Sequence, residues 1–253
     1  MEAIEGDKLS EIKIGSFPEQ IQWKLYRTKQ HLLEFEQEAY KYMNVLPSGP
    51  GRLVRAPEST LEKPLYFYAT IEPIPARFGL IAGDFLQNLR SVLDYLVWQL
   101  ILANGKIPHK TKTAFPITRK VSSFEDAKIN RLVGVPDEAI ALIEALQPYP
   151  ERDRGNRPQP IHILDELTNE NKHRQVLFTT LDSILKPVHP VLYPHVELEI
   201  NRHRGDELIP GERLLAYIAF RGGIVNGLEV TATLSALMDW MGYGVLPQFE
   251  KFF

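Results

Sequence analysis

Long segments with a helical hydrophobic period alternate along the chain with shorter segments rich in proline. After Phe17-Pro18-Glu19, mostly apolar residues recur at steps of three and four as far as Asn44. This spacing places them on one side of a helix. The positions are Ile21, Leu25, Thr28, Leu32, Phe35, Ala39 and Tyr42. We therefore expect a helix that packs along its whole length against other helices.

A second and longer helix is predicted from Pro75 to Asn104-Gly105, because proline favours a first helical turn and glycine favours a stop. Its broad apolar face consists of Phe85, Leu89, Val92, Leu93, Leu96 and Leu100. Gly79 and Gly83 lie one turn apart and favour a close helix crossing. Shorter helices are predicted over 124–132, 137–146 and 164–178, and a last one over 230–252 with a break at 244–247.

Strand patterns occur at 65–71, 196–200 and 214–220, the last two joined by a hairpin-like connection. The predicted fold class is mainly α: a helical bundle with long core helices plus a small antiparallel β-sheet, an α+β arrangement. We expect one domain over 1–253. Its helical core would span 17–180, a small β appendage 190–222, and a C-terminal helix over 230–252 would pack back on the core.

The composition excludes some classes of site but does not indicate a function. The chain has 253 residues, 44% of them hydrophobic and 24% charged, as in ordinary globular proteins. A net charge of −3 provides no global attraction for nucleic acid or membrane, so an anionic partner would have to meet a local patch. The absence of cysteine excludes disulfides, thiolate zinc sites and a catalytic thiol.

The expected location is the bacterial cytoplasm. The first 15 residues are acidic and lack the apolar segment of a signal peptide. The most apolar run, 93–103, is shorter than the roughly 20 residues that cross a membrane, so we expect no membrane partner.

A polar stripe runs along the long helix opposite its apolar face. Asp84, Asn88, Ser91 and Tyr95 follow one another at steps of four, three and four residues. Arg90 and Asp94 form an i,i+4 pair at the edge of this stripe. Solvated helix faces usually carry lysine and glutamate, whereas the middle of this stripe is uncharged. We therefore expect another part of the protein or a ligand to cover it. The alternative, a half-exposed helix with a solvated polar side, has about equal weight.

The 164–178 helix carries an amide among apolar residues. Asn171 shares a face with Leu164 and Leu167, and a buried amide without hydrogen bonds costs about 1–3 kcal/mol. Asn88, Ser91 or Tyr95 are the expected partners.

We therefore expect a polar cluster between the two helices, with Asp84 as the counter-charge of Arg174. The candidate ligand-binding residues are Asp84, Asn88, Arg90, Tyr95, Asn171, Lys172 and Arg174. Arg90, Lys172 and Arg174 would contact phosphate, and the others would orient the ligand. A purely structural network that only sets helix register is an equally weighted alternative.

A metal site has weaker support. His162, Glu166 and His173 fall on one face of the 164–178 helix, which is expected to point away from the apolar side. Glu170-x-x-His173 has the spacing found in di-metal helical bundles, but no second Glu-x-x-His occurs. Phosphate-binding, dinucleotide-binding and nucleophile-elbow motifs do not occur, and no cofactor is expected.

Four phrases carry a family resemblance: GDFLQNLRSVLDYLVWQL, AFPI, IEALQPY and LDELTNENKHRQVL, in this order. Over residues 81–177 the chain resembles a widespread family of uncharacterised bacterial proteins that share these motifs. That family implies no particular activity.

A more distant similarity is to the HEPN superfamily of helical bundles, which are often dimeric RNases of toxin and defence systems. Their motif is an arginine followed after four to six residues by a histidine. Arg90 occupies the arginine position, but Tyr95 stands at the histidine position. Tyrosine, with an ordinary pKa near 10, is a poor base at neutral pH. The resemblance implies a homo-oligomer and an RNA-like ligand.

The function predicted first is binding of a nucleotide or RNA-like anionic ligand at the inter-helix polar cluster. The alternative is a non-enzymatic interaction module in which the same polar residues are structural. A metal-dependent hydrolase is a third possibility, and the sequence leaves open whether the protein is an enzyme.

Overall fold

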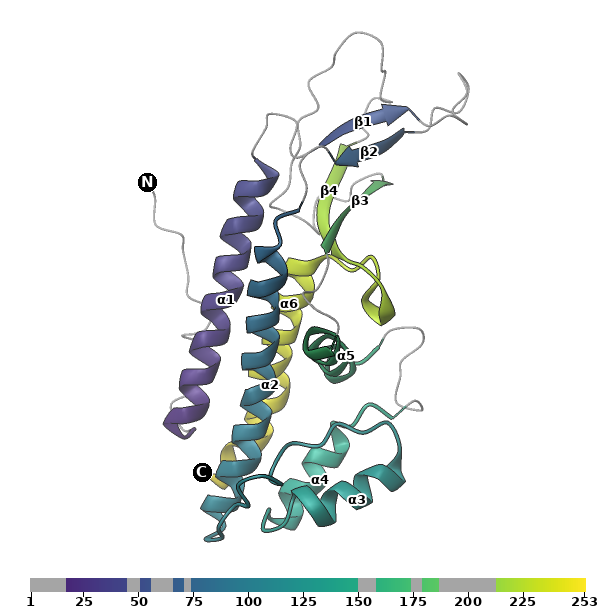
Figure 1. The fold of residues 1–253 in the computed structure, drawn as a ribbon. Helices are drawn as coiled ribbons and strands as arrows, with labels where there is room; N and C mark the ends of the chain where they lie inside the picture. The colour runs from purple at the N-terminus through teal and green to yellow at the C-terminus, as the bar shows by residue number, and fades with distance from the viewer. Residues whose placement is uncertain are drawn as a thin grey trace. The chain divides into compact units, whose positions relative to one another are not determined.

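The computed structural model describes residues 17–44, 51–55, 66–70, 74–149, 158–173, 179–186 and 213–253 (Figure 1). The chain divides into two compact units. Unit 1 consists of Met1–Leu32, Ala82–Gln175 and Leu234–Phe253, and unit 2 of Leu33–Ile81 and Val176–Thr233. The single domain expected over 1–253 stays a prediction.

The protein is mainly helical, which confirms this part of the predicted fold class. The helices are α1 (Glu19–Met43), α2 (Arg77–Ala103), α3 (Val121–Arg131), α4 (Asp137–Ala145), α5 (Pro160–His173) and α6 (Val230–Asp239). After α6 the chain continues as a π-helical turn, Trp240–Val245, and a 3-10 helix, Leu246–Phe252. The regular α-helix ends at Asp239, earlier than expected. The break expected over 244–247 coincides with the change from the π-helical turn to the 3-10 helix, where Pro247 has no N–H to donate. None of the helices in the described residues is long and apolar enough to cross a membrane.

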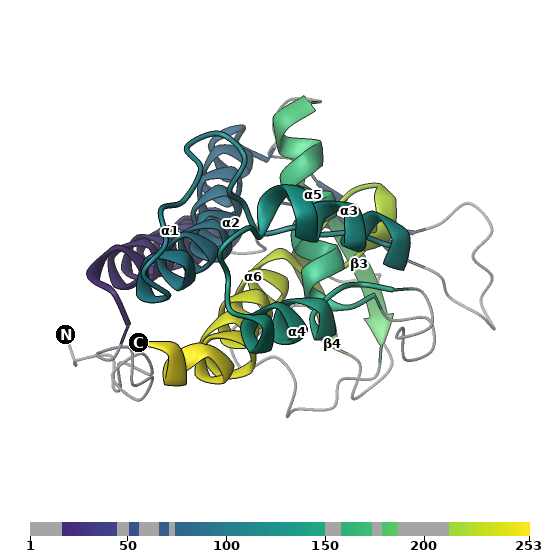
Figure 2. The same ribbon diagram turned by 90° about the horizontal axis from the view of Figure 1, so that it is seen from below.

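In unit 1, the first part of α1 runs antiparallel beside α2 (Figures 1 and 2). Gln99 Nε2 lies 3.4 Å from Gln20 Oε1, and Lys24 Nζ lies 3.2 Å from Asn88 Oδ1, so rising numbers on one helix meet falling numbers on the other. All six apolar positions predicted on the long helix are fully buried: Phe85, Leu89, Val92, Leu93, Leu96 and Leu100. The helical period therefore identified the core face of α2 correctly.

Within the residues that the structure describes, unit 2 contains two pairs of antiparallel strands. β1 (Gly51–Arg55) pairs with β2 (Tyr66–Thr70), and β3 (Thr179–Lys186) pairs with β4 (Arg213–Phe220). β4 falls on the predicted 214–220 strand, and β2 falls within 65–71. The partner of β4 comes from 179–186, which had no assigned strand, and the expected strand at 196–200 lies outside the described residues.

α6 begins after Glu229, whose carboxylate accepts hydrogen bonds from the backbone N–H groups of Thr231 and Ala232. An acceptor at this position satisfies donors that the first turn of a helix leaves unpaired. Burial raises the pKa of Glu229 above its ordinary value, while the two backbone hydrogen bonds act in the opposite direction.

α5 approaches α2 closely at Gly83, within unit 1. A methyl group placed on Gly83 would lie 2.7 Å from Asn171 Oδ1 and 2.8 Å from its Nδ2. The side chain of Asn171 therefore occupies the space that a Cβ at position 83 would need. Gly79 and Gly83 were expected to permit a close helix crossing, and at Gly83 a helix, α5, packs closely against α2.

This contact predicts that the effect of Gly83→Ala depends on residue 171. In the wild-type chain, the added methyl group overpacks against the amide and should lower the free energy of unfolding by about 1–3 kcal/mol. In an Asn171→Ala background the clash is gone, and the higher helix propensity of alanine should stabilise the protein by up to about 1 kcal/mol. Urea unfolding of the four proteins measures both effects. Equal effects in the two backgrounds would show that the two residues do not touch.

Candidate functional site

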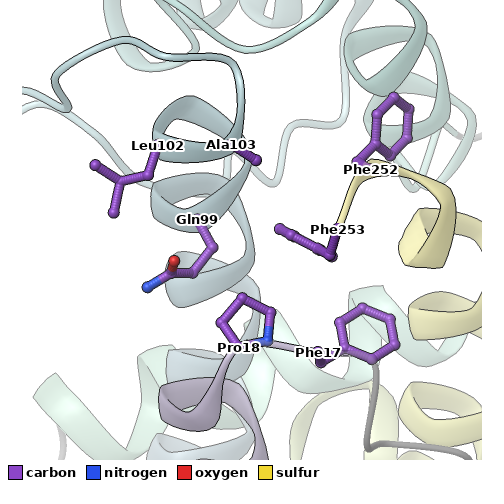
Figure 3. Close-up of a pocket in the computed structure, with 7 residues that line it drawn as sticks. All are labelled: Phe17, Pro18, Gln99, Leu102, Ala103, Phe252 and Phe253. Atoms are coloured by element: carbon purple, nitrogen blue, oxygen red, sulfur yellow. The ribbon is translucent and has the colours of Figure 1, made fainter.

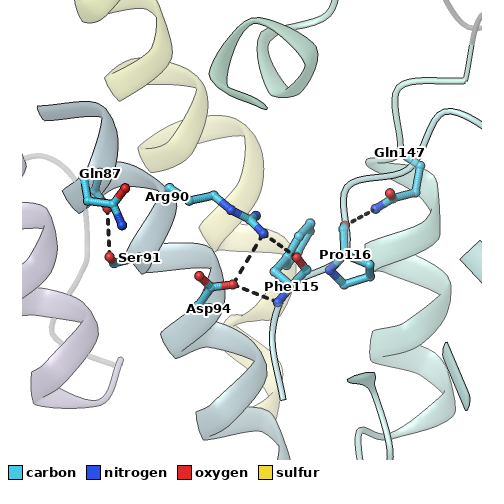
Figure 4. A network of polar contacts seen from close by, with 7 residues as sticks. All are labelled: Gln87, Arg90, Ser91, Asp94, Phe115, Pro116 and Gln147. Atoms are coloured by element: carbon cyan, nitrogen blue, oxygen red, sulfur yellow. Dashed lines mark hydrogen bonds and ion pairs between the residues drawn. The ribbon is translucent and has the colours of Figure 1, made fainter. Parts of the chain in front are cut away.

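In unit 1, side chains of α2 hold the backbone of Phe115 at both its N–H and its C=O (Figure 4). Arg90 Nη2 donates a hydrogen bond of 2.6 Å to the Phe115 carbonyl, and Asp94 Oδ1 accepts one of 2.9 Å from the Phe115 N–H. Phe115 itself is fully buried. Arg90 and Asp94 thus supply the donor and the acceptor that this buried backbone requires.

Arg90 and Asp94 also contact each other. Arg90 Nη2 lies 3.6 Å from Asp94 Oδ1, and the Arg90 side chain is only 13% exposed. Arg90 Nη1 is buried and has no hydrogen-bond partner among the described residues. The i,i+4 pair predicted at the edge of the stripe therefore exists, but its main partner is the backbone of a segment 25 positions along the chain from Arg90.

We call the segment 115–119 the Phe115 strap. The buried side chain of Gln147 holds it at Pro116 and Thr118. Gln147 Nε2 donates to the carbonyls of Pro116 (3.0 Å) and Ile143 (2.9 Å). Its Oε1 accepts from the Thr118 N–H at 2.8 Å and lies 3.3 Å from the Thr118 hydroxyl. Every polar group of this amide is used, which is what burial of an amide requires.

The predicted polar stripe separates into different surroundings. Asp84 is exposed, and Ser91 donates to the Gln87 carbonyl of its own helix (2.8 Å). In the described part of the chain, Asn88, Ser91 and Tyr95 form no hydrogen bond with Asn171, contrary to expectation. The reason is rotational: Asn171 lies at Gly83, seven residues before Arg90 and on the same side of α2. The side chain of Lys172 and the whole of Arg174, with its expected pairing to Asp84, lie outside the described residues.

Asn88 and Tyr95 meet a lysine of α1 instead. Asn88 Nδ2 donates to the Asp84 carbonyl at 2.8 Å, which turns its Oδ1 toward Lys24 Nζ, 3.2 Å away. The same ammonium group lies 5.8 Å from the centre of the Tyr95 ring. The Tyr95 side chain is 37% exposed. This Lys24–Asn88–Tyr95 cluster places a cation beside an accessible aromatic ring.

The four weak metal candidates do not form a metal site in the described residues. No group of three or more His, Asp or Glu side chains there is arranged to hold a metal ion. His162 was expected to face away from the apolar side, and this is wrong, since only 5% of it is exposed. Arg119, at the end of the Phe115 strap, covers it: Arg119 Nη1 lies 2.7 Å from His162 Nε2. Glu166 lies 3.5 Å from the same ring nitrogen.

Glu170 and His173 complete the predicted metal set. Glu170 is half-buried on α5, and no ion pair to it forms within the described residues. The backbone of His173 ends α5, and its side chain lies outside what the structure describes.

An open groove in unit 1 has a volume of about 580 Å³ (Figure 3). Its lining residues are Phe17, Pro18, Gln99, Leu102, Ala103, Phe252 and Phe253. The rings of Phe17 and Phe253 lie 5.5 Å apart at an interplanar angle of 59°. The lining contains no charged side chain, so this groove does not suit the anionic ligand that the polar residues suggest.

Comparison with protein-family models, curated proteins and solved structures finds no match to this chain. The chemistry of the clusters therefore has to be argued from their own geometry.

Lys24, Gln147 and Arg119 were missing from the predicted site. For Gln147 a signal existed, because it follows Ile140 and Ile143 at steps of three and four and so lies on the apolar face of α4. That is the same signal that singled out Asn171. Lys24 and Arg119 look like ordinary surface cations in the sequence, and only the structure shows their partners.

The hydrogen bonds to Phe115 predict a stability effect of Arg90. Arg90→Met keeps the aliphatic stem and removes the donors, which leaves the buried Phe115 carbonyl unpaired. The free energy of unfolding should fall by about 1–3 kcal/mol. Arg131→Met is the matched control, because Arg131 is exposed at the end of α3, and it should change stability by less than about 0.5 kcal/mol. If both variants behave alike in urea unfolding, Arg90 does not hold the strap.

Proposed function

We propose that the protein binds a nucleotide or RNA-like anionic ligand through the Lys24–Asn88–Tyr95 cluster. The observation that carries this proposal is an ammonium group held over an accessible ring by neutral partners. Lys24 contacts an amide oxygen and an aromatic face, and no carboxylate pairs with it in the described part of the chain. Its charge is therefore available to a phosphate group, while the ring of Tyr95 is available to a base.

Other positions of α1 carry further exposed aromatic and cationic side chains. Trp23 and Tyr26 are 61% and 54% exposed, and their rings meet edge to face at 5.9 Å. Arg27 lies one turn after Trp23, on the same side of α1 as Trp23. Its Nη1 donates a hydrogen bond to Gln30 Oε1 at 3.2 Å, which leaves its other donors for a ligand. Exposed rings interleaved with cations suit single-stranded nucleic acid, because bases stack on the rings and phosphates meet the cations.

The distant HEPN resemblance agrees with this ligand class, although Tyr95 replaces the histidine of its motif. In this proposal Tyr95 stacks on a base and takes no part in cleavage. Arg90, which was expected to contact phosphate, has no such role here because its Nη2 is engaged by Phe115 and Asp94. The predicted homo-oligomer and the cytoplasmic location remain part of the proposal.

The second candidate function is a non-enzymatic interaction module with a structural polar network. It draws support from the hydrogen bonds of Arg90, Asp94 and Gln147, all of which serve the Phe115 strap. The two candidates differ in what the Lys24–Asn88–Tyr95 cluster does, since only the first requires it to bind a ligand.

Fluorescence anisotropy with a labelled single-stranded oligoribonucleotide tests the first candidate. Tyr95→Ala should weaken binding about 5- to 150-fold, the equivalent of ~1–3 kcal/mol for one stacked base. Tyr95→Phe keeps the ring and should bind within about twofold of the wild type. Lys24→Gln should weaken binding and reduce the slope of log K against log salt by about 0.7, as expected for one lost phosphate contact.

Lys110→Gln is the control for Lys24, because Lys110 is an exposed lysine of the loop after α2. Thermal unfolding monitored by circular dichroism checks that each variant is folded. If Tyr95→Ala and Lys24→Gln bind the oligonucleotide as tightly as the control, the cluster is not a ligand site and the second candidate stands.

A further inference from the structure

Arg119 and Glu166 both contact the same ring nitrogen, Nε2 of His162. Arg119 Nη1 lies 2.7 Å and Glu166 Oε1 lies 3.5 Å from His162 Nε2. Arg119 is the last residue of the Phe115 strap, whereas the other two belong to α5. The imidazole is buried, but Arg119 is exposed and the Glu166 side chain is 43% exposed. The cluster therefore lies at the surface with its histidine underneath.

A hydrogen bond from Arg119 requires one particular tautomer of His162. A guanidinium group has only donors, so Nε2 has to accept a hydrogen bond from Arg119. The ring is then neutral, with its proton on Nδ1. These are the charged groups that contact the ring in the described residues: Arg119 from the strap side and Glu166 from its own helix.

Protonation of His162 reverses these preferences. An Nε2–H group would point at the N–H groups of Arg119, so donor would face donor and cation would face cation. Glu166, at the same nitrogen, would become the favourable partner. The two neighbours thus require opposite states of the histidine, and histidine changes its charge between about pH 5 and pH 8.

We propose that Arg119 and His162 form a proton-gated site for a tetrahedral oxyanion, such as the phosphate group of a metabolite or a sulfate ion. The anion would accept one hydrogen bond from the Arg119 guanidinium and one from the protonated Nε2 of His162. It relieves the repulsion between the two cations and competes with Glu166 for the imidazolium. Binding is then coupled to the uptake of one proton by His162.

Arg119 suits this role because it forms no ion pair in the described residues, with Glu166 contacting the histidine rather than the guanidinium. Its hydrogen-bond partner in the described residues is a ring nitrogen of His162. One of its five donors is used, and guanidinium is the side chain that matches tetrahedral oxyanions best. The site uses none of the residues of the Lys24–Asn88–Tyr95 cluster, so it does not depend on the function proposed above.

Sulfate is the appropriate probe, because it stays a dianion throughout this pH range and any pH dependence must come from the protein. We expect isothermal titration calorimetry at constant ionic strength to show binding at about pH 5.5 that weakens at higher pH. Once free His162 is neutral, the affinity should fall about tenfold for each pH unit, the slope for one linked proton. Titrations in two buffers of different ionisation enthalpy should show uptake of one proton.

Four variants separate this site from general salt effects. Arg119→Gln should lose the binding at every pH. His162→Gln keeps an acceptor for Arg119 and should bind sulfate weakly, without pH dependence. Glu166→Gln removes the competing carboxylate and should bind several-fold more tightly at low pH. Arg131→Gln, an exposed arginine of α3, should match the wild type. Equal sulfate binding by the wild type and Arg119→Gln would overturn the proposal.

A measurement on the wild-type protein keeps the proposal testable if a variant fails to fold. Nitrogen-15 NMR of the histidine side chains identifies the protonated ring nitrogen. We expect the proton of neutral His162 on Nδ1, and a change to the doubly protonated ring when sulfate is added near neutral pH. A proton on Nε2 in the neutral ring would contradict the hydrogen bond from Arg119 and overturn the proposal.

Discussion

A buried backbone segment needs partners for its N–H and C=O groups, and this requirement explains the polar residues on the core side of α2. The Phe115 strap is neither helix nor strand, so it cannot pair its own backbone. Asp94 and Arg90 supply an acceptor and a donor one helical turn apart, and these reach the N–H and the C=O of the same residue, Phe115. An apolar α2 would leave both ends unpaired, at a cost of about 1–3 kcal/mol each.

The same requirement continues along the strap and connects separate parts of unit 1. Gln147, two residues after α4 ends, forms hydrogen bonds with Pro116 and Thr118, and Arg119 then contacts His162 on α5. A segment without secondary structure is thus tied to three helical regions within five residues. This explains how an exposed arginine is positioned precisely enough at one ring nitrogen for the charge of that ring to matter.

The four phrases singled out in the sequence meet one another in this arrangement. Arg90 and Asp94 belong to the first phrase, Phe115 and Pro116 to the second, and Gln147 to the third, and these residues are joined by hydrogen bonds. Asn171, from the fourth phrase, lies against Gly83 of the first. Arg90, which was expected to contact phosphate, therefore maintains a local structure. The ligand surface that we propose lies on another side of α2, where Lys24 adds the charge.

The sequence was sufficient for the elements that depend on periodicity. The helices and the buried face of α2 follow from the spacing of apolar residues, and a paired Arg90 and Asp94 follow from i,i+4 geometry. What it did not contain was the identity of the partner, because a backbone amide carries no residue type and Phe115 lies far along the chain. The rotation of α5 was equally hidden: a single amide on an apolar face does not reveal whether it meets Asn88 or Gly83.

The most direct test of this account is hydrogen exchange at the Phe115 backbone amide, measured by NMR. If Asp94 holds this N–H in a buried hydrogen bond, it should exchange as slowly as amides in the core of α2 and lose that protection in Asp94→Ala. Neighbouring amides of α2 should stay protected in the variant. Exchange of the wild-type Phe115 amide at the rate of an unstructured peptide would contradict the account, because the strap would then not be held by α2.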